Sequence, residues 1–526
     1  MPVKWFEWGK EAFELSRKEK KPVLLDIHGV WCHWCHVADK TTYSDPLIIK
    51  EINDNFVPVK VDTDRRPDIN ERYNQGGWPT TVFLDSNGNI ITGATYVPPH
   101  EFGFMLERVK NFYEKNAEKI PQMTERERKP AEIDLAGVPE EVSMRVKESF
   151  DVNYGGFGHG QKFPMSEVIE FCIFMRKDSQ FKMFALMTLD RMTALQDGVE
   201  GGFFRYSVSP DWSVPHYEKM LEGNAEVIRS YVHGYALTRK KEYADTARKA
   251  IGYVMKNLAG DAFYGSQDAD EEYYSLGMEE RSKREKPGID KTIFTNFNAK
   301  MISALLEASV FVDASYRKTA LEVIGFILEN LYSTEKGFRH CAGGEYGLLT
   351  DNSQMLRTLL DAYETTTDMR YLELAKETAS FIEKNFFDGV TLNDRLRGND
   401  IGMLRMRNRN LAENSTVADS FIRIAFHTDD GSFMEKAENI LKDLGDVYGM
   451  YGMMAAPYAL AIERLSGVQV KLQCSAPEYD EALKIFNPLR MIRFIVEGQF
   501  TAGICKGTVC MQPAKSMEEL RKVLES

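Results

Sequence analysis

Helical periodicity repeated along residues 139–466 is the feature that most constrains the fold. Apolar segments such as NAKMISALLEASVFV alternate with charged ones such as KKEYADTARKAIGYVMKNL, and almost no strand pattern interrupts them. A charged amphipathic helix keeps one face in water, whereas a helix that is apolar all round must be enclosed by protein. Six such pairs, repeating at roughly 50–70 residues, predict a closed (α/α)6 barrel with the apolar helices inside. The predicted helices span roughly residues 139–151, 165–177, 181–196, 216–238, 240–257, 296–313, 314–331, 350–366, 370–385, 412–426, 431–446 and 451–465.

The first 112 residues have a different pattern, in which strand and helix signals alternate. PVLLDIHG and FVPVKVDTD are short apolar runs typical of buried strands, and WPTTVFLD and NIITGATYV flank an Asn87-Gly88 turn typical of a hairpin. Helical spacing precedes the first strand, follows it from Cys35 to about Phe56, and returns over residues 101–116. The order helix–strand–helix–strand–strand–strand–helix predicts an α/β domain.

The pattern changes twice more along the chain. Residues 113–138 are polar and contain prolines without a core pattern, which is typical of a linker. Residues 467–526 contain two strand-like runs, VQVKL and MIRFIVEG, and two helical stretches, which predict a small α/β appendage. We therefore predict a multi-domain protein with folded parts at 1–112, 139–466 and 467–526, the first of which is followed by the linker.

The overall composition argues against several classes of protein. The 526-residue chain carries a net charge of −13 without a long basic run, so nucleic acid and anionic membranes are poor partners. No stretch approaches about 18 consecutive apolar residues, and the N-terminus lacks the pattern of a signal peptide. Seven cysteines, a small and odd number for this length, indicate a reducing compartment with free thiols. We expect a cytoplasmic protein with no membrane and no nucleic-acid partner.

The string WCHWCHV at residues 31–37 is compatible with three chemistries. C-x-x-C-H attaches haem in c-type cytochromes, Cys and His side chains together bind zinc, and C-x-x-C before a helix forms the redox pair of thioredoxin-like proteins. The flanking sequence favours the third, because Cys32 follows a predicted strand and begins a helix. A helix N-terminus lowers a thiol pKa from about 8.5 to roughly 3.5–7.5. Cys35, one turn later, is placed to resolve a mixed disulfide.

Two segments outside the motif support a thioredoxin-type site. Asp26 lies in the preceding strand, where a buried carboxylate would carry the proton of Cys35. In GGWPTTVFLD, Pro79 directly precedes a strand, and we expect the Trp78–Pro79 bond to be cis and to face a bound substrate. The predicted catalytic residues are therefore Cys32, Cys35 and Asp26, and the predicted binding residues are Trp78 and Pro79.

Three other interpretations of the motif remain open at this point. Haem attachment requires export, for which the sequence carries no signal. A zinc site needs converging ligands, but consecutive residues of a helix point in different directions, and the other close pair, Cys505 and Cys510, lies far along the chain. That second pair has either a structural role or forms a second thiol relay. The last interpretation is a thioredoxin fold with inert cysteines. We expect neither a metal nor a cofactor.

Loops between the predicted helix pairs are rich in glycine, aromatic and charged residues, as in GVEGGFFRYSVSPDWSVPH and SQDAD. The starts of the inner helices would open onto one end of the barrel, where such loops would surround a pocket for a sugar-like ligand. A His–Glu pair or two carboxylates there would act as general acid and base. Asp and Asn at helix starts are also common N-caps. The catalytic candidates are His216, Glu218 and Asp270, and the binding candidates are Phe203, Arg205, Tyr206, Trp212, Asp268, Asn298, Asp351 and Asn414.

Several strings along the chain together resemble one family. They are CHWCHV, FVPVKVDTDRRPD, GGWP, GGFG with KFP, GGFFRYSVSPDWSVPHYEKMLEGNA, SQDAD and ICKGTVCMQP, in this order. The chain resembles the YyaL-like, or spermatogenesis-associated, protein family. The resemblance implies a thioredoxin-like N-terminal domain followed by an (α/α)6 barrel similar to those of N-acylglucosamine 2-epimerases and six-hairpin glycosidases. Such epimerases use histidines on inner helices as acid–base partners, and here only His216 is well placed.

Three functions are compatible with these observations. In the first, Cys32 attacks a disulfide, Cys35 resolves it, and the barrel binds a carbohydrate-like ligand or a client. In the second, the barrel is a sugar epimerase, isomerase or hydrolase and the thioredoxin-like domain is structural. In the third, the chain is a non-enzymatic binding module. We favour the first, with a polar small molecule or a protein thiol as partner.

Overall fold

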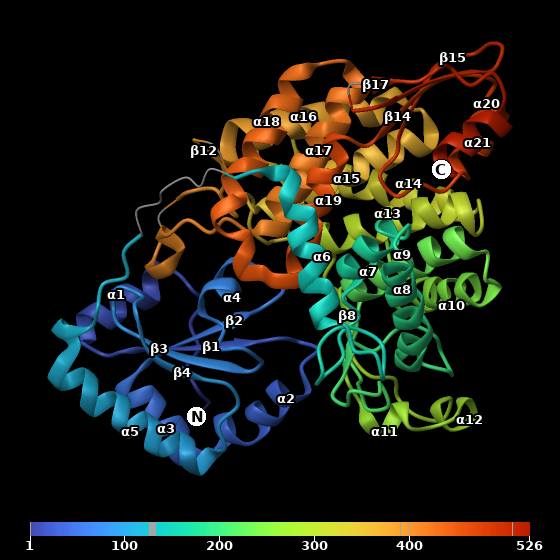
Figure 1. Ribbon diagram of the computed structural model, residues 1–526. Helices are drawn as coiled ribbons and strands as arrows, with labels where there is room; N and C mark the ends of the chain where they lie inside the picture. Colours follow the sequence, from blue (N-terminus) through green and yellow to red (C-terminus); the bar gives the residue numbers. More distant parts are fainter. Residues whose placement is uncertain (1, 126–132, 390, 399, 508, 526) are drawn as a thin grey trace. The chain divides into compact units, whose positions relative to one another are not determined.

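The computed structural model describes the chain except for residues 1, 126–132, 390, 399, 508 and 526. It divides into two compact units (Figure 1). The predicted domain limit at residue 112 falls inside helix α5 (Pro99–Asn116), and residues 126–132 of the predicted linker lie outside the described part. The first unit consists of Met1–Arg128, Asp268–Asp270 and Arg395–Asn408, and the second consists of Lys129–Gln267, Glu271–Asp394 and Arg409–Ser526.

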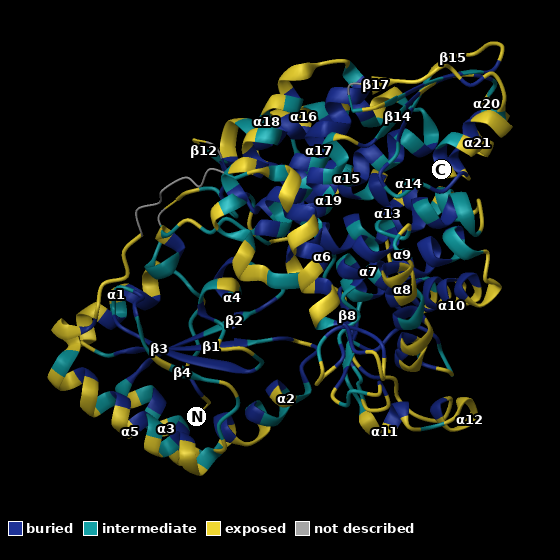
Figure 2. Ribbon diagram, in the orientation of Figure 1, coloured by how far each residue is buried: buried dark blue, intermediate teal, exposed yellow. Residues whose placement is uncertain are grey.

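A four-stranded sheet in the order β2-β1-β3-β4 forms the centre of the first unit. β1 pairs in parallel with β2 and antiparallel with β3, so Asp26 lies between Lys60 and Thr81. The two central strands, β1 and β3, are buried almost throughout and appear dark blue in Figure 2, which explains their nearly continuous apolar sequences. The strands are β1 (Val23–His28), β2 (Val57–Asp62), β3 (Thr80–Leu84) and β4 (Ile90–Ala94).

Helices pack on both faces of this sheet. The helix predicted from Cys35 to Phe56 is interrupted, because Asp45 and Pro46 start a new helix: Pro46 lacks an N–H, and the Asp45 carboxylate accepts the N–H groups of Leu47 and Ile48. A further short helix, α4, was not predicted. The helices are α1 (Lys10–Glu19), α2 (His33–Lys40), α3 (Pro46–Asn55), α4 (Pro67–Tyr73) and α5 (Pro99–Asn116).

In the second unit, six inner helices form a closed ring within the described part of the chain. α7 contacts α9, and the contacts continue through α13, α15, α17 and α19 back to α7. Each inner helix also packs against an outer helix, and the predicted (α/α)6 barrel is confirmed. The inner helices are α7 (Ser166–Phe174), α9 (Leu221–Thr238), α13 (Thr295–Phe311), α15 (Leu349–Thr366), α17 (Leu411–Thr428) and α19 (Ala456–Leu465). The outer ones, in the order of the inner helices they cover, are α8 (Ser179–Met192), α10 (Lys241–Asn257), α14 (Tyr316–Asn330), α16 (Met369–Phe386), α18 (Gly431–Asp443) and α6 (Val138–Ser149).

The sequences of α13 and α14 show why one helix is inner and the other outer. Most residues of α13 are buried, including polar ones such as Asn298. In α14, by contrast, the buried residues are Ala320, Val323, Ile324 and Ile327, a single stripe at the spacing of an amphipathic helix. The alternation of apolar and charged segments thus corresponds to two layers of the barrel.

Small sheets complete the second unit. The predicted α/β region at its C-terminal end is present as a four-stranded sheet in the order β15-β14-β16-β17 with two helices. Its elements are β14 (Val468–Gln473), α20 (Ala476–Leu483), β15 (Met491–Val496), β16 (Thr501–Lys506), β17 (Val509–Cys510) and α21 (Met517–Glu525). Short strands also form in the barrel loops, namely β5 (Tyr206–Ser207), β6 (Pro215–His216), β7 (Lys219–Met220), β8 (Ser266–Gln267), β9 (Ile289–Asp290), β10 (Tyr332–Ser333), β11 (Gly337–Phe338), β12 (Phe387–Asp388) and β13 (Thr391–Leu392).

A membrane-crossing helix would have to be both long and apolar. Across the described ranges, no helix combines the two properties.

Candidate functional sites

The cysteine motif lies where β1 leads into α2. Cys32 is the N-cap of α2, and the N–H of Cys35 donates to its Sγ at 3.1 Å. The two cysteines form a disulfide with their Cα atoms 5.2 Å apart, and each is no more than 4% exposed. A sulfur at this position receives hydrogen bonding and the partial positive charge of the helix end, both of which favour a thiolate. Among the described residues, no three or more His, Cys, Asp or Glu side chains are grouped as metal ligands.

Two tryptophans connect the cysteine motif to the GGWP segment. The Trp31 indole N–H donates to Asp64 at 2.7 Å, and its ring packs edge to face against Trp78 with centroids 5.5 Å apart. The Trp78–Pro79 bond is cis, as predicted. The structure therefore brings together the two segments that the sequence analysis assigned to one site.

Trp34, inside the motif, is exposed. Its side chain is 46% accessible, and its ring lies 5.1 Å from that of Tyr96 and 5.8 Å from that of His33. An exposed aromatic surface of this kind is suited to contact with another molecule. It is contributed by the residues directly beside the disulfide.

Asp26 is a buried carboxyl group with an unusual pKa. It is 1% exposed, accepts a hydrogen bond from the Tyr43 hydroxyl at 3.1 Å, and has the Lys60 ammonium 3.5 Å away. Burial raises the pKa of Asp26 to about 6, because the loss of hydration outweighs the attraction of Lys60. A carboxyl group with this pKa exchanges its proton near neutral pH.

The two histidines flanking the site have pKa values shifted in opposite directions. Burial lowers the pKa of His28 to about 4, so this ring is neutral at pH 7. A hydrogen bond to Asp268, 2.9 Å away, raises the pKa of His36. Asp268 and Asp270 both belong to the first unit. The structure therefore does not place Asp270 in one unit with His216 and Glu218, with which it was predicted to act.

His216 and Glu218 do come together in the second unit. His216 Nδ1 lies 2.5 Å from Oε2 of Glu218, whose side chain is 1% exposed. The imidazole stacks on Tyr206 at 4.9 Å, and Arg205 places its guanidinium 5.5 Å from the centroid of the same ring. Four of the predicted residues thus form one cluster on the β5–β6 hairpin and the residues that follow it.

Phe203 and Trp212, two of the predicted binding residues, are core residues instead. Trp212 is fully buried and donates its indole N–H to the Tyr154 carbonyl at 3.1 Å. Phe203 is 2% exposed and stacks on Tyr231 at 5.5 Å. Neither ring leaves a face on which a ligand could stack.

Asparagines at the fourth position of four inner helices hold the preceding loops. In α13, Oδ1 of Asn298 accepts the Phe263 N–H at 2.9 Å, and Nδ2 donates to the Phe294 carbonyl at 2.9 Å. Both amide ends are therefore used by backbone, and the side chain is fully buried, so Asn298 offers no surface to a ligand. The same arrangement recurs at Asn224, Asn352 and Asn414 in α9, α15 and α17.

Asp351 likewise has an internal role. It is fully buried, and its carboxylate lies 3.0 Å from Nδ1 of His340 and accepts the Asn296 N–H at 3.2 Å. Of the helix-start residues predicted to bind a ligand, Asn298, Asp351 and Asn414 therefore stabilise the turns that enter the inner helices.

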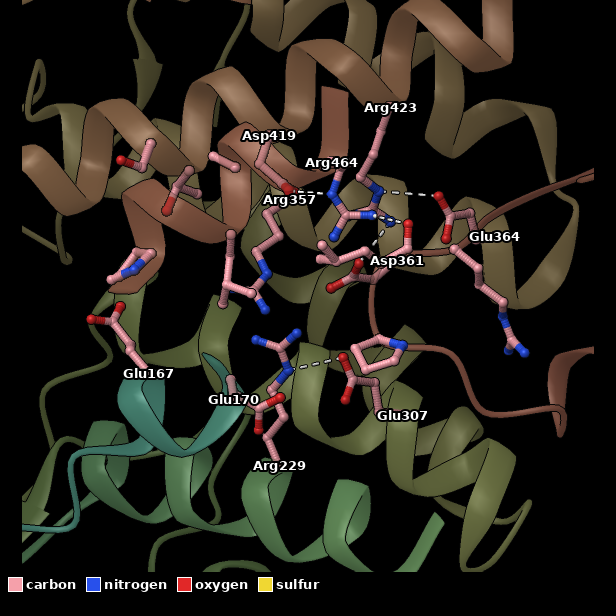
Figure 3. A pocket seen from close by; sticks show the side chains of 18 residues that line it. Glu167, Glu170, Arg229, Glu307, Arg357, Asp361, Glu364, Asp419, Arg423 and Arg464 are labelled. Carbon is pink, nitrogen blue, oxygen red and sulfur yellow. Dashed lines mark hydrogen bonds and ion pairs between the residues drawn. The ribbon is translucent and has the colours of Figure 1, made fainter. Parts of the chain in front are cut away.

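A charged cavity inside the helix ring was missed by the sequence analysis. It has a volume of about 180 Å³ and is lined by side chains from all six inner helices and from the segment between α20 and β15. Figure 3 shows charged groups converging on this space from several helices. The labelled residues are Glu167, Glu170, Arg229, Glu307, Arg357, Asp361, Glu364, Asp419, Arg423 and Arg464.

Ion pairs connect neighbouring inner helices around this cavity. Arg423 lies 2.8 Å from Asp361 and 3.0 Å from Glu364, which are on the adjacent α15. Although burial disfavours charge, Arg423 and His427 lower the pKa of Glu364 to about 2. His233 of α9 lies 2.5 Å from both Glu170 and Glu307, and its pKa is raised to about 9 by these carboxylates despite burial. Glu364 and His233 are therefore ionised at neutral pH, whereas burial lowers the pKa of His427 below its usual value.

The sequence did contain a signal for the cavity. On α15, Arg357, Asp361 and Glu364 recur at helical spacing along one face of a mostly buried helix, and α17 repeats the pattern with Asp419 and Arg423. Charges at such positions on a helix assigned to the interior must meet one another across the barrel.

The expectation that the cysteines stay free is wrong for four of the seven. Besides Cys32 and Cys35, Cys505 and Cys510 form a disulfide, because the antiparallel pairing of β16 and β17 places them directly opposite each other with Cα atoms 4.0 Å apart. The free cysteines in the described part of the chain are Cys172, Cys341 and Cys474, all buried.

Parts of the chain are similar to known proteins. A family model named Thioredox_DsbH and described as "Protein of unknown function, DUF255" matches residues 1–130. Spermatogenesis-associated protein 20 of Homo sapiens is 31% identical over 325 residues, which are 55% of this chain and 41% of the relative. Thiol:disulfide interchange protein DsbD of Yersinia pestis is 28% identical over 100 residues, 18% of this chain and 17% of that protein.

Among solved structures, a sugar epimerase from a ruminal bacterium aligns with 59% of this chain and 87% of its own, at a TM-score of 0.48 and 15% identity. The chain spans about two fifths of the length of the human relative that it matches. The resemblance inferred from the motifs is confirmed: the chain is similar to spermatogenesis-associated protein 20 over 55% of its length, and its residues 1–130 match the thioredoxin-like DUF255 family model.

Proposed function

We propose that the first unit catalyses thiol–disulfide exchange with a protein client at Cys32 and Cys35. The observation that carries this proposal is the position of Cys32 Sγ at the start of α2, where it accepts the Cys35 N–H. In the reduced protein, the Cys32 thiolate attacks a client disulfide and releases one client thiolate. The Cys35 thiolate then attacks Sγ of Cys32, which frees the second client thiolate. Two electrons pass to the client, whose two thiolates take up protons, and the enzyme is left as the disulfide.

Asp26 and Trp34 have supporting roles in this proposal. The Cys35 thiol must lose its proton before it attacks, and a carboxylate with a pKa of about 6 is a suitable acceptor at neutral pH. Trp34 offers an exposed aromatic surface next to the disulfide for contact with the client. We place the reaction in the cytoplasm, where the cellular thiol pool would return the disulfide to the dithiol.

Single cysteine variants test the proposal directly. Cys32→Ser removes the attacking thiolate and should abolish reduction of a model protein disulfide, whereas Cys35→Ser should trap a mixed disulfide at Cys32 that mass spectrometry detects. The double variant Cys505→Ser/Cys510→Ser is the matched control and should retain exchange activity. Retained activity in Cys32→Ser would show that the motif is not the reactive site. Zinc bound in stoichiometric amount and lost in Cys32→Ser would make the motif a metal site.

A second function is favoured by the cavity of about 180 Å³ in the barrel. We infer that the barrel binds a polar, carbohydrate-like molecule. His216 and Glu218, 2.5 Å apart, are not among the residues that line this cavity, and they would supply acid–base chemistry in the barrel loops if the barrel is an epimerase, isomerase or hydrolase. Turnover of a sugar library that survives Cys32→Ser but is lost in His216→Ala would support catalysis there. Saturable binding without turnover would make the barrel a binding module.

A further inference from the structure

Two arginines in the barrel cavity have donor groups that the protein does not use. Arg357 of α15 forms no hydrogen bond or ion pair with any described residue. Arg229 of α9 donates to Glu307 through Nε at 3.0 Å, and its terminal nitrogens bond no described side chain or carbonyl. Figure 3 shows the two side chains pointing toward one another across the cavity. The cavity therefore contains a pair of converging guanidinium groups with free N–H donors.

An anion between the two guanidinium groups would stabilise both of them, although Glu307, Glu170 and Asp361 already support the charge of Arg229 and raise its pKa despite burial. Two guanidinium groups that face each other repel, and the repulsion is screened less inside a protein than in bulk water. Each guanidinium presents N–H groups in a planar fork that matches the oxygens of a carboxylate or phosphate. An oxyanion between Arg357 and Arg229 would satisfy both.

The other charged groups around the cavity, except Glu167, already have partners within the protein. Arg423 pairs with Asp361 and Glu364, and Arg464 pairs with Asp419. Glu170 and Glu307 share the His233 imidazolium, and Arg490 donates to the carbonyls of Ala482 and Leu483. The unused hydrogen-bonding capacity of the arginines is thus concentrated at Arg357 and Arg229, which indicates a negatively charged ligand.

Glu167 of α7 is the one lining carboxyl group, among those that the structure describes, without a hydrogen bond or ion pair. Burial, together with the neighbouring Glu226, raises its pKa to about 7, although Lys300 opposes the shift. Near neutral pH this group therefore both donates and accepts hydrogen bonds, as a hydroxyl group of a ligand requires. In Figure 3 Glu167 lies at the edge of the space that the two arginines enter.

We propose that the cavity binds a small hydroxylated molecule whose carboxylate or phosphate lies between Arg357 and Arg229, while Glu167 contacts one of its hydroxyl groups. The inference rests on the ligand-binding role proposed for the barrel and narrows its ligand from polar molecules in general to organic oxyanions. The cavity of about 180 Å³ suits a small metabolite, because drug-sized ligands occupy roughly 300–1,000 Å³.

Isothermal titration of the full chain with four probes tests the proposal. The probes are gluconate, glucose 6-phosphate, uncharged glucose and inorganic phosphate. One or both charged sugars should bind at least tenfold more tightly than glucose, and the comparison between them distinguishes a carboxylate from a phosphate ligand. Inorganic phosphate should compete with the charged sugar in the unaltered protein, so this part of the test does not depend on the folding of any variant.

Variants identify the residues responsible. Arg357→Gln should weaken binding of the charged sugar by about tenfold or more, because a charge-assisted pair of hydrogen bonds is lost. Arg248→Gln, on the outer helix α10 and paired with Asp245, is the matched control and should bind as the unaltered protein does. Glu167→Ala should weaken binding of gluconate but not that of acetate, which has no hydroxyl group.

The outcomes separate this inference from the one on which it rests. If glucose binds as tightly as the charged sugars and phosphate does not compete, the oxyanion site is wrong while a polar-ligand barrel remains. If none of the probes binds, both are contradicted. If charged sugars bind but Arg357→Gln and Arg248→Gln behave alike, the anion does not lie between Arg357 and Arg229, and the proposed site is wrong.

Discussion

In the first unit, one stretch of chain between residues 26 and 35 supplies the cysteine pair, the helix start and the buried carboxyl group. In the barrel, the charged groups around the cavity come from six helices spread between residues 167 and 464 and from Arg490. Removing a group from the cysteine site changes the chemistry of that site, but few other buried groups lose an interaction partner. Removing a group from the second leaves opposite charges buried without partners. The first arrangement should therefore tolerate substitution, whereas the second should couple substitution to stability.

The largest expected effect is on the barrel. Arg423→Leu leaves Asp361 and Glu364 buried without their counter-charge, which should lower the free energy of unfolding by roughly 3–5 kcal/mol. Arg248→Leu, which breaks an exposed pair with Asp245, should cost less than about 1 kcal/mol. Chemical denaturation followed by circular dichroism measures both. Equal losses of stability in the two variants would show that the buried ion pairs contribute no more than the exposed pair.

Asp26→Asn should raise the free energy of unfolding, whereas Arg423→Leu should lower it. Because burial raises the folded-state pKa from 3.8 to about 6, the ionised carboxylate costs stability above pH 6, and the cost disappears as the pH falls below 4. The variant should therefore be more stable than the unaltered protein by up to roughly 3 kcal/mol at pH 8 and equally stable at pH 4. Thermal unfolding at the two pH values measures this, with the exposed Asp54→Asn as control. A gain that is the same at both pH values would contradict a titrating Asp26.

Asn352→Ala tests the loop contacts of the barrel. Loss of the amide leaves the Phe338 N–H and the Leu348 carbonyl without this partner, which should cost about 1–3 kcal/mol. Asn330→Ala removes an exposed amide that bonds only its own helix, and should cost much less. Denaturation of both variants gives the comparison. A similar small loss in each would mean that these asparagines do not hold the loops.

The smallest expected effect is that of Trp34→Ala. The side chain is exposed and packs mainly on Tyr96 and His33, so stability should change by less than about 0.5 kcal/mol. The KM for a protein disulfide should rise a few-fold if the indole contacts the client, while exchange with a small disulfide stays the same. An equal effect on both substrates would instead place Trp34 in the chemistry of the thiols.

Features could be predicted from the sequence where the residues that produce them lie close together in the chain. The strand, Cys32, Cys35 and the cis proline were predictable because each signal lies within a few residues of its effect. Asn298 and Asn414 were noticed, but their roles depend on loop backbone more than 20 residues away, which no local pattern specifies. The Cys505–Cys510 disulfide depends on strand register. The cavity depends on which helices are neighbours, and that follows only once the ring is closed.

The way the ring closes has a consequence for biosynthesis. α6, the first helix of the barrel, packs on α19, the last, and α19 also contacts α7. These partners are separated by roughly 300 residues, so a nascent chain cannot complete the ring until α19 has left the ribosome. Until then, Glu167 on α7 and Asp419 on α17 border an open gap instead of a cavity within a closed ring of helices. A chain that ends before residue 456 would expose this charged interior to water, and we expect it to depend on chaperones and to be degraded.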